Sequence, residues 1–338
     1  MASTPALDML RLLGGFQISQ ALYVVARTAI ADQLVAGPVP IARLAEFAGV
    51  REDMLRRVVR SLAAESVFIY DADEDIVGLG LLGPTLVSES PGSVRNVALM
   101  WMQTHYLAFA ELEGTLHDGV PAAEHAHGRP FYAWLGDDPA RTSIFSAAMA
   151  DLMRVMRRDA LASLRFDGVR RVVDIGGADG TVLGGLATRH LHLRGTVFDL
   201  PHVVAAAPGV LRELGVGERI DTAAGDAFVA VPPDADCYLA CGVLQGWNDE
   251  QASHALARIH EAAAPDTRLV IVDMVVGESS EPQLVGLLDL TMMAMSGGRG
   301  RTAQDWQNLL SAAGFRLDQI RPHGPVCVIE ASRQPHKP

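Results

Sequence analysis

The sequence predicts an α/β fold, a parallel sheet with helices on both faces, preceded by a helical region. From residue 170 onward, apolar segments such as RRVVDIG, GTVFDLP, DCYLACGVL and TRLVIVDMVV alternate with segments of helical spacing. Residues 7–36 carry apolar side chains at helical spacing and end at Gly37-Pro38. Residues 38–82 predict two short helices and a strand hairpin, the order of elements in a winged helix.

Three ranges follow from these patterns. Residues 1–95 are expected to form an N-terminal winged-helix-like domain, 96–165 a helical linker that caps the substrate, and 166–338 the α/β domain. Within the second range, HDGVPAAEHAHGRP (117–130) is rich in Gly, Pro and His and predicts a loop.

Composition indicates a soluble, cytoplasmic protein. The 338 residues carry a net charge of -12, which argues against nucleic-acid binding by a sustained positive field. Three cysteines do not form a disulfide framework, which favours a reducing compartment. No apolar run approaches the roughly 20 residues that a membrane span needs. A regulator that binds DNA through the winged helix stays open as a non-enzymatic alternative.

The most specific local signal is VVDIGGADGTVLGGL, residues 172–186. An apolar strand ends in Asp174, and a turn follows that contains Gly176, Gly177 and Gly180. Glycines at such a turn allow the backbone to approach a ligand closely. The nicotinamide fingerprint G-x-G-x-x-G is absent, because its third and sixth positions are Ala178 and Thr181. A carboxylate before the turn suits a ligand without phosphate and with a positive centre, such as S-adenosylmethionine.

Two further strand ends carry an acidic residue. Asp199 stands nineteen residues beyond Gly180 and is placed to accept hydrogen bonds from both hydroxyls of a ribose. Asp226 follows the next expected strand and is placed to bind an adenine amino group, with Phe228 beside the ring.

The order VVDIGGADG, FDLP, GDAF, GVLQGWNDE and MSGGRGRT resembles the class I S-adenosylmethionine-dependent O-methyltransferases of the plant caffeate type and their bacterial natural-product relatives. The resemblance implies a Rossmann-like catalytic domain, an N-terminal dimerisation domain, a homodimer and an aromatic or polyketide-like acceptor. It also implies that the glycines line the methionine and sugar part of the cofactor. Asp199 and Leu200 would contact the ribose and adenine edge, and Asp226 and Phe228 the adenine.

The sequence departs from this family where the general base is expected. Most members have His, followed by Asp, in the segment that reads VLQGWND here, and Glu in the segment that reads GGRGRT. The corresponding residues are Gln245, Gly246 and Gly300. Glutamine accepts no proton at working pH, whereas a histidine base contributes roughly 10²–10⁴-fold to a rate.

Three explanations fit the missing base. The nucleophile needs no base, and proximity and alignment supply the rate. A second histidine replaces it, and His105 in the predicted capping segment is the candidate. Alternatively, methyl transfer is lost, and the cofactor is retained for hydroxylation, decarboxylation or cyclisation. Cys241 is expected beside the cofactor in a packing role, without a basic neighbour to activate it.

The acceptor is expected to contact aromatic and methionine side chains, because thioethers pack well against rings and the family's acceptor pocket lies in these segments. The expected substrate residues are Trp101, Met149, Met153, Met292 and Met295. No metal site is expected, because His125 and His127 have no partners at ligand spacing.

Overall fold

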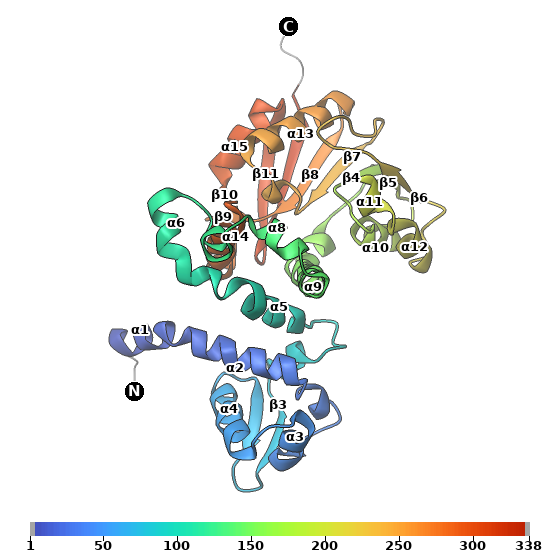
Figure 1. The fold of residues 1–338 in the computed structure, drawn as a ribbon. Coiled ribbons are helices and arrows are strands. Elements are labelled where there is room, and N and C mark those ends of the chain that lie inside the picture. The colour runs from blue at the N-terminus through green and yellow to red at the C-terminus, as the bar shows by residue number, and fades with distance from the viewer. Residues whose placement is uncertain (1–3, 335–338) are drawn as a thin grey trace. The chain divides into compact units, whose positions relative to one another are not determined.

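The computed structural model describes residues 4–334, which divide into two compact units. The first unit extends to Val155 and includes Ala294–Ser296; the second comprises Met156–Met293 and the chain from Gly297 onward. Figure 1 shows the elements of each unit. The prediction of an α/β domain after a helical region is confirmed, and the three-part division into 1–95, 96–165 and 166–338 stays a prediction.

The first unit begins with helices and a small sheet in the order expected of a winged helix. Its sheet has the strand order β1-β3-β2, with both pairs antiparallel. The turn between α3 and α4 is made by Gly49, whose φ of 63° favours glycine. The elements are α1 Pro5–Leu13, α2 Gly15–Thr28, β1 Val39–Pro40, α3 Ile41–Ala48, α4 Glu52–Ala64, β2 Phe68–Asp71 and β3 Ile76–Leu79.

Short helices complete the first unit: α5 Arg95–Met100, α6 Leu112–Asp118, α7 Ala122–His127 and α8 Phe131–Gly136, followed by the start of α9 Pro139–Ser163. The predicted loop 117–130 is therefore wrong in its centre, where α7 lies. Pro121 before the helix and Gly128 after it, with φ 71°, bound a single short helix instead of removing it.

The second unit is built on a seven-stranded sheet with the order β11-β12-β8-β7-β4-β5-β6. The pairs from β8 to β6 are parallel, and β12 and β11 join antiparallel at the other edge. The strands are β4 Arg171–Ile175, β5 Arg194–Asp199, β6 Ile220–Ala224, β7 Cys237–Cys241, β8 Arg268–Asp273, β11 Phe315–His323 and β12 Val326–Arg333. Every residue of β7 is buried, as expected of a central parallel strand.

Helices cover both faces of this sheet. One core cluster joins Leu256, Ile259 and Trp306 to Tyr238 and Leu269 of the central strands. The helices of this unit are the end of α9, α10 Thr181–Arg189, α11 Pro201–Val204, α12 Ala207–Glu213, α13 Asp249–Ala262, α14 Pro282–Ser296 up to Met293, and α15 Ala303–Ala312.

The chain passes from β4 outward to β5 and β6 and then returns to β7 on the other side of β4. This reversal is the switch point at which ligands bind beyond the carboxyl ends of strands in open α/β sheets.

Candidate functional site

The turn after β4 is held against β5 by its own backbone. The N–H groups of Gly176 and Gly177 both donate to the carbonyl oxygen of Phe198, at 2.9 and 3.2 Å. Gly176 has φ 68°, and a Cβ there would lie 2.6 Å from Cγ2 of Val243. Gly180 has φ 79° and precedes α10. Conformation and space therefore require glycine at Gly176, and the turn presents bare backbone at the switch point.

Asp174 lies directly beneath this turn. A Cβ on Gly177 would approach its Oδ2 to 2.8 Å. Both carboxylate oxygens are buried without a hydrogen-bond partner among residues 4–334. Burial raises the pKa of Asp174 to about 7, and the positive charge of Arg157 opposes that rise. A buried carboxyl group without partners requires an explanation, and a donor that arrives with a ligand is one that fits this site.

Asp199 fixes the far side of the glycine turn. Its Oδ2 accepts from the N–H of Ala178 at 3.0 Å, and its Oδ1 accepts from Leu200 at 2.7 Å. The first bond holds Ala178 at φ 49°. Each carboxylate oxygen retains a further lone pair, so Asp199 remains able to accept from a diol.

Asp226 and Phe228 lie just beyond β6. Oδ1 of Asp226 accepts from the N–H of Phe228 at 2.8 Å, which fixes this short loop. The Phe228 ring contacts Trp247, with centroids 4.8 Å apart. The loop thus offers a free carboxylate oxygen and an aromatic face close together, as a purine requires.

Arg157, which no sequence pattern singled out, lies beside the end of β7. Gly242 has φ 69°, and a Cβ there would lie 2.4 Å from Nη2 of Arg157. Arg157 lies on α9 and acts electrostatically on Asp174, Cys241 and Asp273. Burial raises the pKa of the Cys241 thiol to about 12, so it is no thiolate at neutral pH. No local motif marks Arg157, because only the fold brings α9 to this strand end.

The Gln245 turn, defined as residues 244–247, follows β7. The N–H of Gln245 donates to Oδ2 of Asp273 at 3.2 Å. The side-chain Oε1 of Gln245 is buried without a hydrogen-bond partner in the described part of the chain. Because Val243 contacts the glycine turn at Gly176, the Gln245 turn and the glycine turn are neighbours.

Neighbouring side chains fill the space that a side chain at Gly300 would occupy. A Cβ there would lie 2.5 Å from Cγ2 of Val276 and 3.1 Å from Oδ1 of Asp289. The N–H of Gly300 donates to the same Oδ1 at 2.6 Å. A glutamate at this position would require these neighbours to move.

The remaining predicted residues divide between the units. Met292 belongs to the second unit, with all the predicted cofactor residues; the first holds His105, Trp101, Met149, Met153 and Met295. Trp101 and Met149 pack on one apolar cluster there, and Met295 belongs to another with Phe131.

His105 is buried, and its Nδ1 lies 2.7 Å from Oγ1 of Thr104. Burial lowers the pKa of His105 to about 4, so the imidazole is neutral at pH 7. Its catalytic role stays a prediction.

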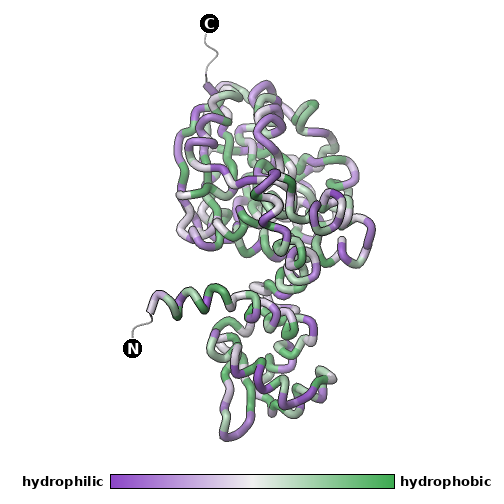
Figure 2. The backbone as a smooth tube through the Cα atoms, turned by 60° about the vertical axis from the view of Figure 1, so that its left-hand side comes forward, coloured by the Kyte–Doolittle hydropathy of each residue, from purple (hydrophilic) through white to green (hydrophobic). Residues whose placement is uncertain are grey.

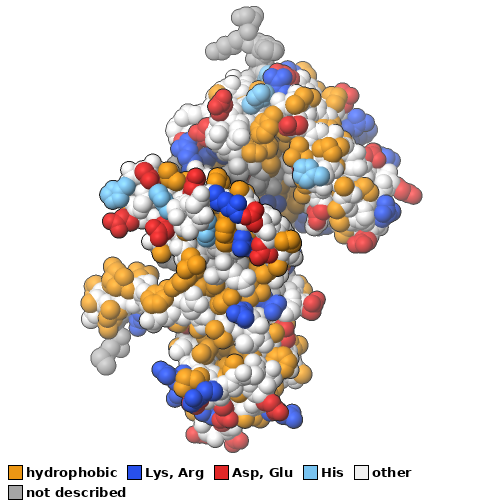
Figure 3. All heavy atoms as spheres, in the orientation of Figure 1, with side chains coloured by type: hydrophobic (Ala, Val, Ile, Leu, Met, Phe, Trp, Pro, Cys, Tyr) orange, Lys and Arg blue, Asp and Glu red, His pale blue; other side chains and the backbone are white. Residues whose placement is uncertain are grey.

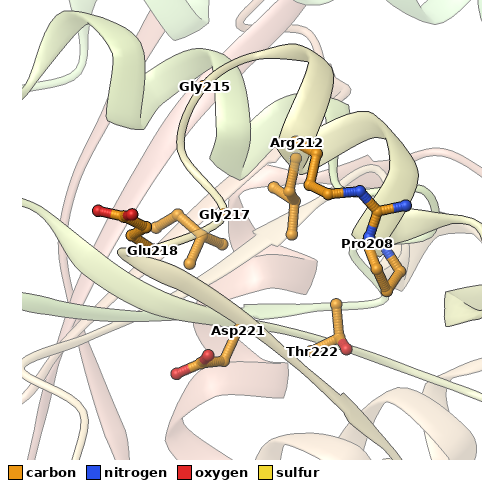
Figure 4. A pocket seen from close by; sticks show the side chains of 9 residues that line it. Pro208, Arg212, Gly215, Gly217, Glu218, Asp221 and Thr222 are labelled. Carbon is orange, nitrogen blue, oxygen red and sulfur yellow. The ribbon is translucent and has the colours of Figure 1, made fainter.

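A surface hollow of about 570 Å³ lies elsewhere in the second unit. It lies between α12 and the start of β6, and Figure 4 shows Arg212, Glu218 and Asp221 among its lining residues. It is distinct from the site above, because the glycine turn and Asp199 stand at the carboxyl ends of the strands.

Known proteins are similar to this chain in sequence and in fold. The O-methyltransferase domain family matches residues 109–316. A phenazine O-methyltransferase of Lysobacter antibioticus is 33% identical over 324 residues, covering 96% of this chain and 95% of the relative. An 8-amino-8-demethylriboflavin N,N-dimethyltransferase of Streptomyces davaonensis is 34% identical, covering 93% and 91%. The crystal structure of a methyltransferase of calicheamicin biosynthesis, in its S-adenosylhomocysteine-bound form, matches with a TM-score of 0.87 at 27% identity. The match covers 97% of this chain and 98% of that structure.

Proposed function

The chain belongs to the O-methyltransferase domain family and is a methyltransferase that uses S-adenosylmethionine. We propose that it methylates an aromatic small molecule of secondary metabolism without a general base. The observation that carries the proposal is the Gln245 turn beside the glycine turn. Gln245 stands where the family's histidine base is expected. Its buried amide oxygen has no partner among the described residues, and it accepts a hydrogen bond but does not take a proton.

The residues around the glycine turn fit the cofactor by their chemistry. The bound cofactor supplies an electrophilic methyl group on a sulfonium. We assign Asp199, with Leu200, to the ribose, and Asp226 with Phe228 to the adenine. The carboxyl group of Asp174 is suited to accept from the amino group of the cofactor's methionine part. The guanidinium of Arg157 is suited to its carboxylate. Gly176, Gly177 and Gly180 provide the close backbone approach, and Cys241 packs beside it as a thiol.

Alignment replaces proton abstraction in this proposal. Holding two reactants in line contributes several kcal/mol to catalysis, with effective molarities of roughly 10⁵–10⁸ M in well-oriented systems. Gln245 orients the acceptor by accepting from its N–H group, or by donating its own amide N–H to the oxygen of an ionised phenol. His105 remains the alternative base, but its pKa of about 4 makes it a weaker base than an ordinary histidine.

The acceptor class is inferred from relatives whose names specify a phenazine and an aminoflavin, both planar heteroaromatic compounds. We propose that Trp101, Met149, Met153, Met292 and Met295 contact such a ring. The expected acceptor atom is nucleophilic when neutral, as in an aromatic amine, or is an acidic phenol that is ionised at pH 7.

We further propose a cytoplasmic homodimer. In α1, which contains no buried residue, the exposed apolar side chains are Leu7, Met9, Leu10, Leu12 and Leu13. Figure 2 shows this helix next to the N-terminus with hydrophobic segments in green, and Figure 3 shows orange hydrophobic side chains gathered over it. A patch of this kind is typical of a protein interface.

No single helix among residues 4–334 is long and apolar enough to cross a membrane. Only α1 and α2 taken together reach the necessary length and hydropathy, and they are bent by 43° at their junction.

The test is methyl transfer from labelled S-adenosylmethionine to a panel that contains a hydroxyphenazine, a dihydroxynaphthoate, an aminoflavin and a simple phenol. Transfer to the amine or the acidic phenols, with the simple phenol slower by 10²-fold or more, supports the proposal. Tight binding of S-adenosylhomocysteine without transfer to any member would contradict it and favour a non-methylating enzyme.

A further inference from the structure

Arg301 is a buried cation that belongs to none of the cofactor contacts above. Its side chain is 2% exposed. It lies on β10 Arg301–Thr302, which pairs in parallel with β9 Val275–Val276. Burial of a guanidinium costs free energy unless its N–H donors are paired. The hydrogen-bond partners of Arg301 therefore indicate its structural role.

Two of those partners are the carbonyl groups on either side of Gln245 and Gly246. Nη1 donates to the carbonyl oxygen of Leu244 at 2.7 Å, and Nη2 donates to that of Trp247 at 2.7 Å. Nε donates to Oδ1 of Asp249 at 3.0 Å. The planar guanidinium therefore spans both ends of the Gln245 turn, which a lysine ammonium does not reproduce.

The turn is also held from the opposite side. Oδ2 of Asp273 accepts from the N–H of Gln245 at 3.2 Å. The backbone of the turn thus meets fixed partners at Leu244, Gln245 and Trp247, whereas Oε1 of Gln245 meets none among the described residues. Fixed backbone with one free acceptor atom is the arrangement expected of an orienting side chain.

Arg301 is itself anchored. The preceding Gly300 donates to Asp289, and the following Thr302 caps α15 by accepting from the N–H of Asp305 at 3.2 Å. The guanidinium also lies 5.4 Å from the ring centroid of Trp306. Its position is set by the fold of the second unit, independently of any ligand.

We infer that Arg301 is a positioning residue, which fixes the Gln245 turn through the carbonyl groups of Leu244 and Trp247 and so orients Gln245 toward the acceptor. The role assigned to Gln245 rests on the proposed function; the hold of Arg301 on the turn does not.

The variant is Arg301→Lys, and the matched control is Arg299→Gln. Arg299 is 57% exposed and pairs with the same Asp249, but it contacts no carbonyl of the turn. Hydrogen–deuterium exchange of the full chain reports the hold through the N–H groups of the turn, which exchange when the turn opens. Arg301→Lys should raise exchange in peptides covering 244–248 by at least tenfold, with little change in the β4 and β8 peptides, while Arg299→Gln leaves the turn protected.

Catalysis gives the second readout. Arg301→Lys should lower kcat/KM for the best acceptor by up to about tenfold, the loss expected of Gln245→Ala, and change the S-adenosylhomocysteine Kd by less than threefold. In a Gln245→Ala background the same change should cost less than threefold, because its effect passes through Gln245.

Equal losses in both backgrounds, or unchanged exchange in the turn, would overturn the inference. If Arg301→Lys does not fold, Asp249→Ala replaces it. This change removes the acceptor of the Nε hydrogen bond and leaves both carbonyl acceptors in place. A smaller rise in exchange is then expected, and no rise is the contrary result. If the wild type transfers no methyl group while exchange responds as stated, the proposed function fails and the hold of Arg301 stands.

Discussion

Replacing Gly176 by alanine tests the geometry of the cofactor turn. At φ 68° an alanine Cβ is strained by about 1–2 kcal/mol relative to glycine. The same Cβ would lie 2.6 Å from Cγ2 of Val243, and overpacking of this kind costs about 1–3 kcal/mol. Together these terms predict a loss of about 2–5 kcal/mol in the free energy of unfolding.

Gly185 on α10 is the matched control, because a Cβ there meets no atom within 4 Å. Alanine is favoured over glycine inside a helix by about 0.5–1 kcal/mol, so Gly185→Ala should stabilise. Urea unfolding of both variants measures the difference, and calorimetric titration with S-adenosylhomocysteine measures the site. Gly176→Ala should weaken binding tenfold or more, whereas Gly185→Ala leaves it unchanged. Identical unfolding midpoints for the two variants would refute the reasoning.

Three further predictions concern charge, orientation and assembly. Because burial raises the pKa of Asp174 to about 7, above the unfolded value, its contribution to stability is full below about pH 4 and is lost as pH rises through 7. The Tm of Asp174→Asn relative to wild type should therefore rise between pH 5 and pH 8 in thermal scans, and a flat difference contradicts this. Gln245→Ala should lower kcat/KM about tenfold, the worth of one hydrogen bond, with S-adenosylhomocysteine affinity retained; a loss beyond 10³-fold would give Gln245 more than an orienting role. Leu10→Glu with Leu13→Glu should convert a dimer to a monomer in sedimentation experiments, while Leu81→Glu, at a side chain that is 85% exposed, should not; a dimer that survives the double change excludes α1 as the interface.

The common location of the proposed cofactor residues was predictable because parallel strands end at one edge of a sheet. Asp174, Asp199 and Asp226 each lie at or just beyond the end of a strand, and the sheet order β7-β4-β5-β6 brings these ends side by side. Strand patterns and spacing carry that information locally. The segment 117–130 was less predictable, since Pro and Gly mark both a loop and the limits of a short helix.

Arg157 and Arg301 could not be found in the same way. Arg157 reaches the end of β7 from α9, and Arg301 reaches the Gln245 turn from β10, across more than fifty residues of sequence. Neither lies in a motif that specifies its partners. Only the packing of the second unit shows that one arginine faces Asp174 and the other spans the turn that bears Gln245.

The site is ordered although Gln245, Gly246 and Gly300 carry no ionisable side chain. Val276 and Asp289 occupy the space around Gly300, and a Cβ on Gly246 would meet no atom within 4 Å. Arg301 and Asp273 still hold the turn. Each nitrogen of the buried Arg301 guanidinium has a hydrogen-bond partner. A phenol of ordinary pKa, about 10, is ionised to roughly one part in 10³ at pH 7, and nothing at the Gln245 turn removes its proton. In the proposed mechanism the acceptor therefore brings its own nucleophilicity, and this protein contributes the alignment.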